Sequence, residues 1–178
     1  MPDKLPIIEE VDTYPIAEIV EFTELDEEHL GYIERRWKRN PESSIKFDKL
    51  EVKTKRHQQI LQLLARNVRA KGLRPTYNRY VDLRVEGNGT EVLFEVKTAD
   101  ALNFHQQVRR AVGQLLEYRY RYKRYNKRRE IKLAAVIEAE ASVEQYEFAH
   151  GFLSELGIAM VLWKPKTSLF EGLSEVLS

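Results

Sequence analysis

The feature that most constrains this chain is an Asn-Gly pair, Asn88 and Gly89, between two runs rich in β-branched and aromatic residues. These runs span residues 80–86 and 91–98. Asn-Gly tolerates the positive φ angles of a tight two-residue turn, and such a pair between β-rich runs is the strongest short-range signal for a hairpin. The sequence therefore predicts a β-hairpin over residues 80–98.

We expect this hairpin to have one apolar and one polar face, because successive side chains of a strand point to opposite sides. The apolar face would carry Val81, Leu83, Val85, Val92, Phe94 and Val96. The polar face would carry Tyr80, Asp82, Arg84, Leu93, Glu95 and Lys97. With a two-residue turn, the register places Asp82 directly opposite Glu95.

Two carboxylates in this position repel each other, since directly opposed residues have Cβ atoms about 4.5–5.5 Å apart. A divalent cation would offset the repulsion, and hard oxygen ligands suit Mg²⁺, which binds one or two carboxylates and keeps several waters. Lys97 lies one pleat beyond Glu95 on the same face, where its ammonium would orient the water that attacks a phosphodiester. An isolated Glu-x-Lys is usually only solvated charge, so this interpretation depends on Asp82.

With 178 residues, of which 43% are hydrophobic, the chain suits one globular domain with a sizeable core. It has no cysteine, which excludes disulfides, cysteine-ligated zinc and thiol nucleophiles. No apolar run approaches the roughly 18 residues of a membrane span, so we expect a cytoplasmic protein without a membrane partner. Phosphate-binding glycine loops and Ser-His-Asp elbows are also absent from the sequence, so nucleotide and ester hydrolysis have no support.

The net charge of +1 conceals a strong asymmetry along the chain. Residues 1–30 hold ten acidic side chains and a single basic one, Lys4. We divide the chain into an acidic N-terminal appendage, residues 1–48, and a domain over residues 49–178. The appendage would be a lid, an arm that binds a partner protein, a mimic of phosphate or a solubilising extension, and the sequence leaves these alternatives open.

Basic residues interleaved with tyrosines form a stripe near the end of a predicted helix over residues 104–125. Such a stripe suits nucleic acid, because cations neutralise phosphates and aromatic rings stack on bases. The candidate nucleic-acid-binding residues are Arg109, Arg110, Arg119, Arg121, Lys123, Arg124, Lys127 and Arg128. The alternative is an ordinary solvated helix face, which is the usual meaning of a run of charges.

Hydrophobic periodicity gives the remaining elements. Apolar residues at helical spacing predict a helix over residues 53–71, and a Ser142 to Gln145 capping box opens another that ends near residue 157. Two apolar runs, residues 131–137 and 158–163, read as buried parallel strands. The expected fold is α/β, in the order helix, hairpin, helix, strand, helix, strand, with a central mixed sheet flanked by helices.

This order, together with Asp82 and the Glu95-Val96-Lys97 triplet, resembles the PD-(D/E)XK nuclease superfamily over roughly residues 50–163. The resemblance implies a restriction-endonuclease-like core. Gln114 and Tyr118 on the following helix are similar to the Gln-x-x-x-Tyr motif of the RecB-like nuclease branch. The four-residue spacing puts these two side chains on one helical face.

The resemblance also implies a set of roles. Asp82, Glu95 and the Val96 carbonyl would bind Mg²⁺, with Mn²⁺ as a substitute, and Lys97 would orient the water. Gln114 would point into the active site and position the water or the scissile phosphate, and Tyr118 would support the active site or the nucleic acid. Two departures stand out: Val81 replaces the proline of the name, and the glutamate that many members carry on the first helix has no clear counterpart. His57 is the candidate in its place, and Glu51 is a weaker one.

The leading functional hypothesis is therefore an enzyme, a Mg²⁺-dependent deoxyribonuclease. The first alternative is a non-catalytic module that retains the nuclease fold and binds nucleic acid or takes part in an assembly. The second is an unrelated α/β protein-interaction domain. The sequence leaves open endonuclease or exonuclease action, RNA as a substrate, the pathway and the oligomeric state, including a homodimer or a partner bound through the acidic segment.

Overall fold

Seven strands form one sheet in the computed structural model, which describes residues 21–25, 44–78, 80–87, 89–125, 130–138 and 141–178. In spatial order the strands are β1 (Thr23–Glu24), β2 (Pro75–Tyr77), β3 (Leu83–Glu86), β4 (Thr90–Lys97), β5 (Glu130–Glu138), β6 (Ile158–Lys164) and β7 (Leu169–Glu171). The helices are α3 (Ser44–Ala70), α4 (Phe104–Tyr125), α5 (Val143–Glu155) and α6 (Leu173–Val176). β4, β5 and β6 run parallel, and all other neighbours are antiparallel.

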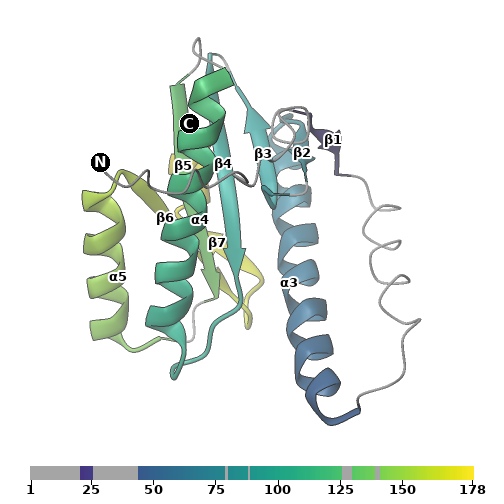
Figure 1. Cartoon of the computed structure of the whole chain (residues 1–178), viewed down its shortest axis with the longest axis vertical. Coiled ribbons are helices and arrows are strands. Elements are labelled where there is room, and N and C mark those ends of the chain that lie inside the picture. Colours follow the sequence, from purple (N-terminus) through teal and green to yellow (C-terminus); the bar gives the residue numbers. More distant parts are fainter. Residues whose placement is uncertain (1–20, 26–43, 79, 88, 126–129, 139–140) are drawn as a thin grey trace, which may run out of the picture.

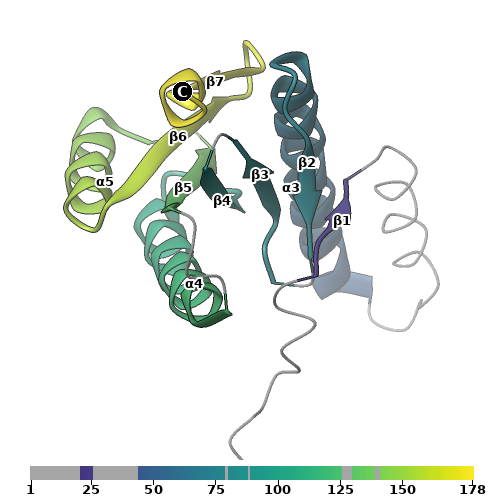
Figure 2. The ribbon, with the colours of Figure 1, turned by 90° about the horizontal axis from the view of Figure 1, so that it is seen from above.

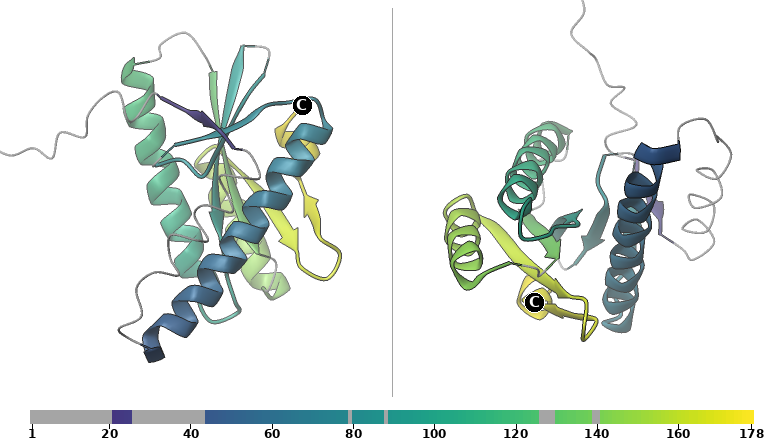
Figure 3. Two further views of the ribbon diagram at one scale, coloured as in Figure 1. Left: turned by 90° about the vertical axis from the view of Figure 1, so that its right-hand side faces the viewer. Right: turned by 90° about the horizontal axis from the view of Figure 1, so that it is seen from below.

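Helices cover both faces of this sheet (Figures 1 and 2). α4 and α5 lie on one face, while α3 and the short α6 lie on the other, and α3 crosses its face obliquely (Figure 3). The parallel strands β4, β5 and β6 are joined by α4 and α5 as βαβ units. The predicted α/β fold, a mixed sheet flanked by helices in the expected order, is confirmed.

The register of the hairpin is the predicted one: Leu83 pairs with Phe94 and Val85 with Val92. Gly89 adopts a φ of 80°, the left-handed conformation that the tight turn requires, and Asn88 lies outside the described residues. The pairing of β3 and β4 begins only at Leu83, so Asp82 lies just before the strand.

One residue of the predicted apolar face is misplaced. Val81 packs with Leu93 on the α4 side of the sheet and not with Leu83 on the α3 side. The cause is a turn: the side-chain carbonyl of Asn78 accepts hydrogen bonds from the backbone N–H groups of Tyr80 and Val81 at 2.9 and 2.8 Å. The strand alternation that we expected from residue 80 onward therefore begins only at residue 83.

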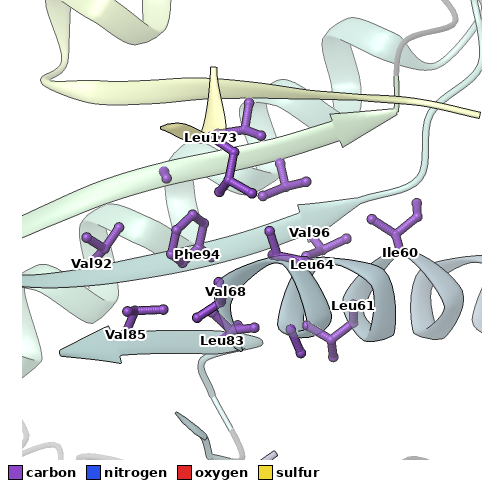
Figure 4. Close-up of a cluster of buried hydrophobic side chains, with 14 of the residues drawn as sticks. Ile60, Leu61, Leu64, Val68, Leu83, Val85, Val92, Phe94, Val96 and Leu173 are labelled. Carbon is purple, nitrogen blue, oxygen red and sulfur yellow. The ribbon is translucent and has the colours of Figure 1, made fainter. Parts of the chain in front are cut away.

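One of two hydrophobic cores lies between α3 and the sheet (Figure 4). Ile60, Leu64 and Val68 follow one another at helical spacing and are fully buried against Leu83 and Phe94. Each such side chain contributes about 1.5–3 kcal/mol when removed from water. The helix begins at Ser44, earlier than predicted, because no proline or glycine interrupts residues 44–70.

The opposite face of the hairpin is covered as well, by α4, which has the predicted bounds. Leu93 and Phe104 belong to this second core. The face predicted as polar is therefore not open to water, and Glu91 and Glu95 are only 0% and 1% exposed. Burial of a carboxylate costs free energy unless the group is paired or binds a cation, so the burial of Glu91 and Glu95 requires an explanation.

Part of the segment predicted as an acidic appendage joins the sheet. β1 pairs with β2, Leu25 is buried in the core, and Glu24 accepts two hydrogen bonds from Arg74. Residues 1–20 and 26–43 of that appendage lie outside the described residues. None of the described helices is long and apolar enough to cross a bilayer.

Candidate active site

Asp82 links three elements at the C-terminal end of β4. Its Oδ2 accepts a hydrogen bond from the backbone N–H of Val96 at 2.8 Å. The same oxygen lies 3.2 Å from Nε2 of His57, which comes from α3. Asp82 lies between a turn and the start of β3. From this position its carboxylate contacts both the strand β4 and the helix α3.

Glu95 is the most deeply buried acid of this group, at 1% exposure. Its Oε1 forms an ion pair with the ammonium of Lys97. Its Oε2 is buried and has no hydrogen-bond partner among the described residues. Burial and, secondly, the negative charge of Asp82 raise the pKa of Glu95 to about 8, against the opposing effect of Lys97.

His57 lies beside both carboxylates. Burial alone would lower its pKa, but the hydrogen bond to Asp82 and the charges of Asp82 and Glu95 outweigh burial and raise the pKa above 6.5. The structure thus brings the histidine of α3 next to Asp82. Glu51, the weaker candidate, has no described side chain.

Gln114 and Tyr118 lie on the flank of α4 that faces this group. The side-chain amide of Gln114 donates to the Tyr118 hydroxyl at 3.1 Å. Tyr118 is 9% exposed, and burial, reinforced by the negative charge of Glu95, raises its pKa above the ordinary value. The contact between Gln114 and Tyr118 agrees with the prediction that their four-residue spacing puts them on one helical face.

The described residues contain no group of three His, Cys, Asp or Glu side chains that could hold a metal ion. A cation here would depend on the two carboxylates, Asp82 and Glu95, with the Val96 carbonyl as a further ligand. Two observations fit a hard divalent cation. The buried Oε2 of Glu95 has no hydrogen-bond partner among the described residues, and Asp82 accepts both of its hydrogen bonds through Oδ2. The donors are all oxygens, as Mg²⁺ and Mn²⁺ prefer.

The basic residues of α4 differ in exposure. Arg109, Arg110, Lys123 and Arg124 are exposed, whereas Arg119 and Arg121 are half-buried, and Arg121 donates to Glu117 at 2.8 Å. Lys127 and Arg128 lie outside the described residues.

The tyrosines of this stripe are also divided. Tyr118 and Tyr122 are buried in the core, so they are not available for stacking on bases, while Tyr120 is 65% exposed. The guanidinium of Arg124 lies 5.7 Å from the centre of the Tyr120 ring. Ten residues separate Gln114 from Arg124, which corresponds to about 15 Å along the helix. The stripe is therefore displaced from the carboxylates along α4.

Sequence reasoning missed a second buried acid near this end of the sheet. Glu138 ends β5, its side chain is 0% exposed, and it forms an ion pair with Arg56 of α3. Trp163, its neighbour on β6, has a buried indole Nε1 without a hydrogen-bond partner among the described residues. The only signal in the sequence was an acid directly after the apolar run 131–137.

Two cavities in the described part of the chain lie beside other residues than the carboxylates. One of about 590 Å³ lies along β6 between α5 and α6, lined among others by Tyr146, Met160 and Gly172. A much smaller one, of about 20 Å³, is lined by Tyr80, Tyr118 and other residues beside α4.

No protein-family model matches this chain, and no curated protein matches it. Among solved structures, it is similar to an XisH family protein from Nostoc punctiforme PCC 73102, with 17% identity and a TM-score of 0.43 over 63% of this chain and 93% of that one. It is also similar to an FdxN element excision controlling factor protein from Anabaena variabilis, with 16% identity and a TM-score of 0.43 over 63% and 95%. At these identities and TM-scores, neither similarity bears on the chemistry of the site.

Proposed function

We propose that the protein is a Mg²⁺-dependent nuclease that hydrolyses phosphodiester bonds in DNA. The observation that carries this proposal is the unsatisfied, buried Oε2 of Glu95, located between Asp82 and Lys97 at the C-terminal end of β4. A carboxylate buried in this way is costly for a purely structural purpose, and a cation would compensate its charge.

Asp82, Glu95 and the Val96 carbonyl would hold the cation. When bound, it would neutralise charge on the scissile phosphate and make water more acidic. Both hydrogen bonds of Asp82 use Oδ2, which leaves Oδ1 for the cation. Lys97 forms an ion pair with Glu95, and its Nζ would hold the attacking water by a hydrogen bond.

His57 orients Asp82 in this account. Its Nε2, 3.2 Å from Oδ2, donates the hydrogen bond that turns the carboxylate toward Glu95. On the other side, Gln114 is held by its hydrogen bond to Tyr118 and would contact the water or the phosphate. The exposed cations of α4, with Tyr120 among them, would bind the DNA strand outside the site.

The test is incubation of the purified protein with supercoiled, linear and single-stranded DNA, each with Mg²⁺, with Mn²⁺ and with chelator. We expect cleavage with either cation and none with chelator. An RNA substrate in the same series decides whether the activity is confined to DNA. Cation-independent cleavage, or none on any substrate, would contradict the proposal.

The alternative is a non-catalytic module that retains the fold and binds nucleic acid. It predicts DNA binding through α4 with no cleavage, whether or not Mg²⁺ binds. Binding without hydrolysis across the whole substrate series would favour this alternative, while the third possibility, a protein-interaction domain, predicts neither.

A further inference from the structure

Glu138 is a buried acid that the proposed mechanism does not use. Its side chain is 0% exposed, at the end of the central strand β5, and its ion-pair partner is the 37% exposed Arg56. An acid in such a position costs free energy unless its partner remains in place. Its location therefore calls for a function beyond the packing of β5.

Arg56 and His57 are consecutive residues of α3, and they reach opposite sides of β4. Arg56 contacts Glu138 on β5, and His57 contacts Asp82, which directly precedes β3. The strand order β3, β4, β5 puts β4 between these two contacts. Adjacent residues of a helix point about 100° apart, so the two contacts together fix both the position and the rotation of this part of α3.

Apolar packing cannot fix this part of the helix by itself. Among the described side chains of α3, Ile60 is the first that belongs to the core. Arg56 and His57 lie N-terminal to it, at 37% and 31% side-chain exposure. In this turn of α3, the ion pair with Glu138 and the hydrogen bond with Asp82 tie the helix to the sheet.

We propose that Glu138 is a positioning residue: through Arg56 it sets the rotation of α3 and so holds His57 against Asp82. The effect of this role on the rate of DNA cleavage rests on the proposed function, but its effect on the position of the His57 ring does not. The geometry requires that loss of the Glu138 charge moves the His57 ring even without cation or DNA.

The test uses the full chain in the absence of cation and DNA, with the ring signals of His57 observed by NMR. The chain has four histidines, and His57→Gln identifies the signals by their disappearance. We expect Glu138→Gln to shift the His57 signals toward those of Asp82→Ala, in which the ring has lost its partner. Arg56→Ala should give the same shift. Arg56→Lys should give His57 signals between those of Arg56→Ala and those of wild type.

Glu91→Gln is the matched control. Glu91 is also 0% exposed and is paired with an arginine, Arg84, at 3.3 Å, but it lies near the start of β4, away from His57. It should reduce stability comparably and leave the His57 signals unchanged. If Glu138→Gln does not fold, the double variant Arg56→Leu with Glu138→Leu leaves no unpaired buried charge and takes its place.

If the protein cleaves DNA, Glu138→Gln should lower kcat by about 10- to 100-fold with little change in KM, as expected for a misplaced catalytic group. A shifted His57 signal in a protein without nuclease activity would support the positioning role and contradict the proposed function. Unchanged His57 signals in both Glu138→Gln and the double variant would overturn the positioning role, whatever the activity.

Discussion

At the scale of single residues, Glu95 combines a pKa raised by burial with a buried carboxylate oxygen that has no hydrogen-bond partner among the described residues. Its counterpart Asp82 is different, because both its hydrogen bonds are made in the absence of a cation. The sequence predicted that the two acids would oppose each other, and it could do so because an Asn-Gly turn fixes register. It could not predict that Glu95 is buried, since burial depends on how α4 packs across the strand.

The first prediction concerns pH. Without a cation, Glu95 keeps its proton in the folded state up to a pKa of about 8 but loses it near 4.5 in the unfolded state. The folded state therefore binds more protons between these values, and its stability falls as the pH rises, by up to about 1.4 kcal/mol per pH unit. Urea unfolding of wild type and Glu95→Gln between pH 4.5 and 8 measures this, and the variant should lose less stability over that range.

The second prediction separates the structural role of Asp82 from its proposed chemical role. Asp82→Ala leaves the buried Val96 N–H without its acceptor and should cost about 1–3 kcal/mol of unfolding free energy without cation. Asp82→Asn retains an acceptor oxygen for the Val96 N–H, so its cost should be smaller. Urea unfolding in chelator compares them, and an equal loss in both variants would show that the charge of Asp82, not its acceptor, stabilises the fold.

At the scale of elements, strong local signals were reliable and weak ones were not. The helix over residues 104–125 and the capping box at Ser142 are found where the sequence placed them, because apolar periodicity and a cap are local properties. The strands β1 and β7 and the helix α6 were missed, since two to four residues carry too little pattern. The two strands form because their neighbours in the sheet, β2 and β6, supply hydrogen-bond partners.

The third prediction concerns the helix α4. Neutralising Arg109, Arg110 and Arg124 together should weaken DNA binding for all sequences alike, because cations that neutralise phosphates release counterions. The slope of log K against log salt should become shallower by about 0.7–0.9 for each phosphate that the variant no longer neutralises.

The control for this prediction replaces three exposed cations near the end of α3, Arg66, Lys71 and Arg74. These should leave the slope nearly unchanged. If both triple variants change the slope equally, α4 is not the DNA-binding surface and the charge effect is general.

At the scale of the whole molecule, the site is an outcome of topology. Parallel strands β4 and β5 end at the same edge of the sheet, and α3 and α4 cover opposite faces of it (Figures 1 and 2). His57 of α3, Glu95 of β4 and Asp82 therefore meet although they are far apart in the sequence. The sequence motif predicted the members that lie on the hairpin and on α4. It could not give the Arg56 to Glu138 contact, which joins residues 82 positions apart and has no local pattern.

The central claim is that Lys97 acts on the chemical step beside two cation-binding carboxylates. The most direct measurement compares DNA cleavage and DNA binding by wild type, Lys97→Ala and Lys132→Ala in Mg²⁺, where Lys132 is an exposed lysine of β5 away from the site. We expect Lys97→Ala to lower the cleavage rate by at least about 100-fold while its DNA affinity stays near that of wild type, and Lys132→Ala to match wild type in both. Cleavage by Lys97→Ala at the wild-type rate would contradict the account.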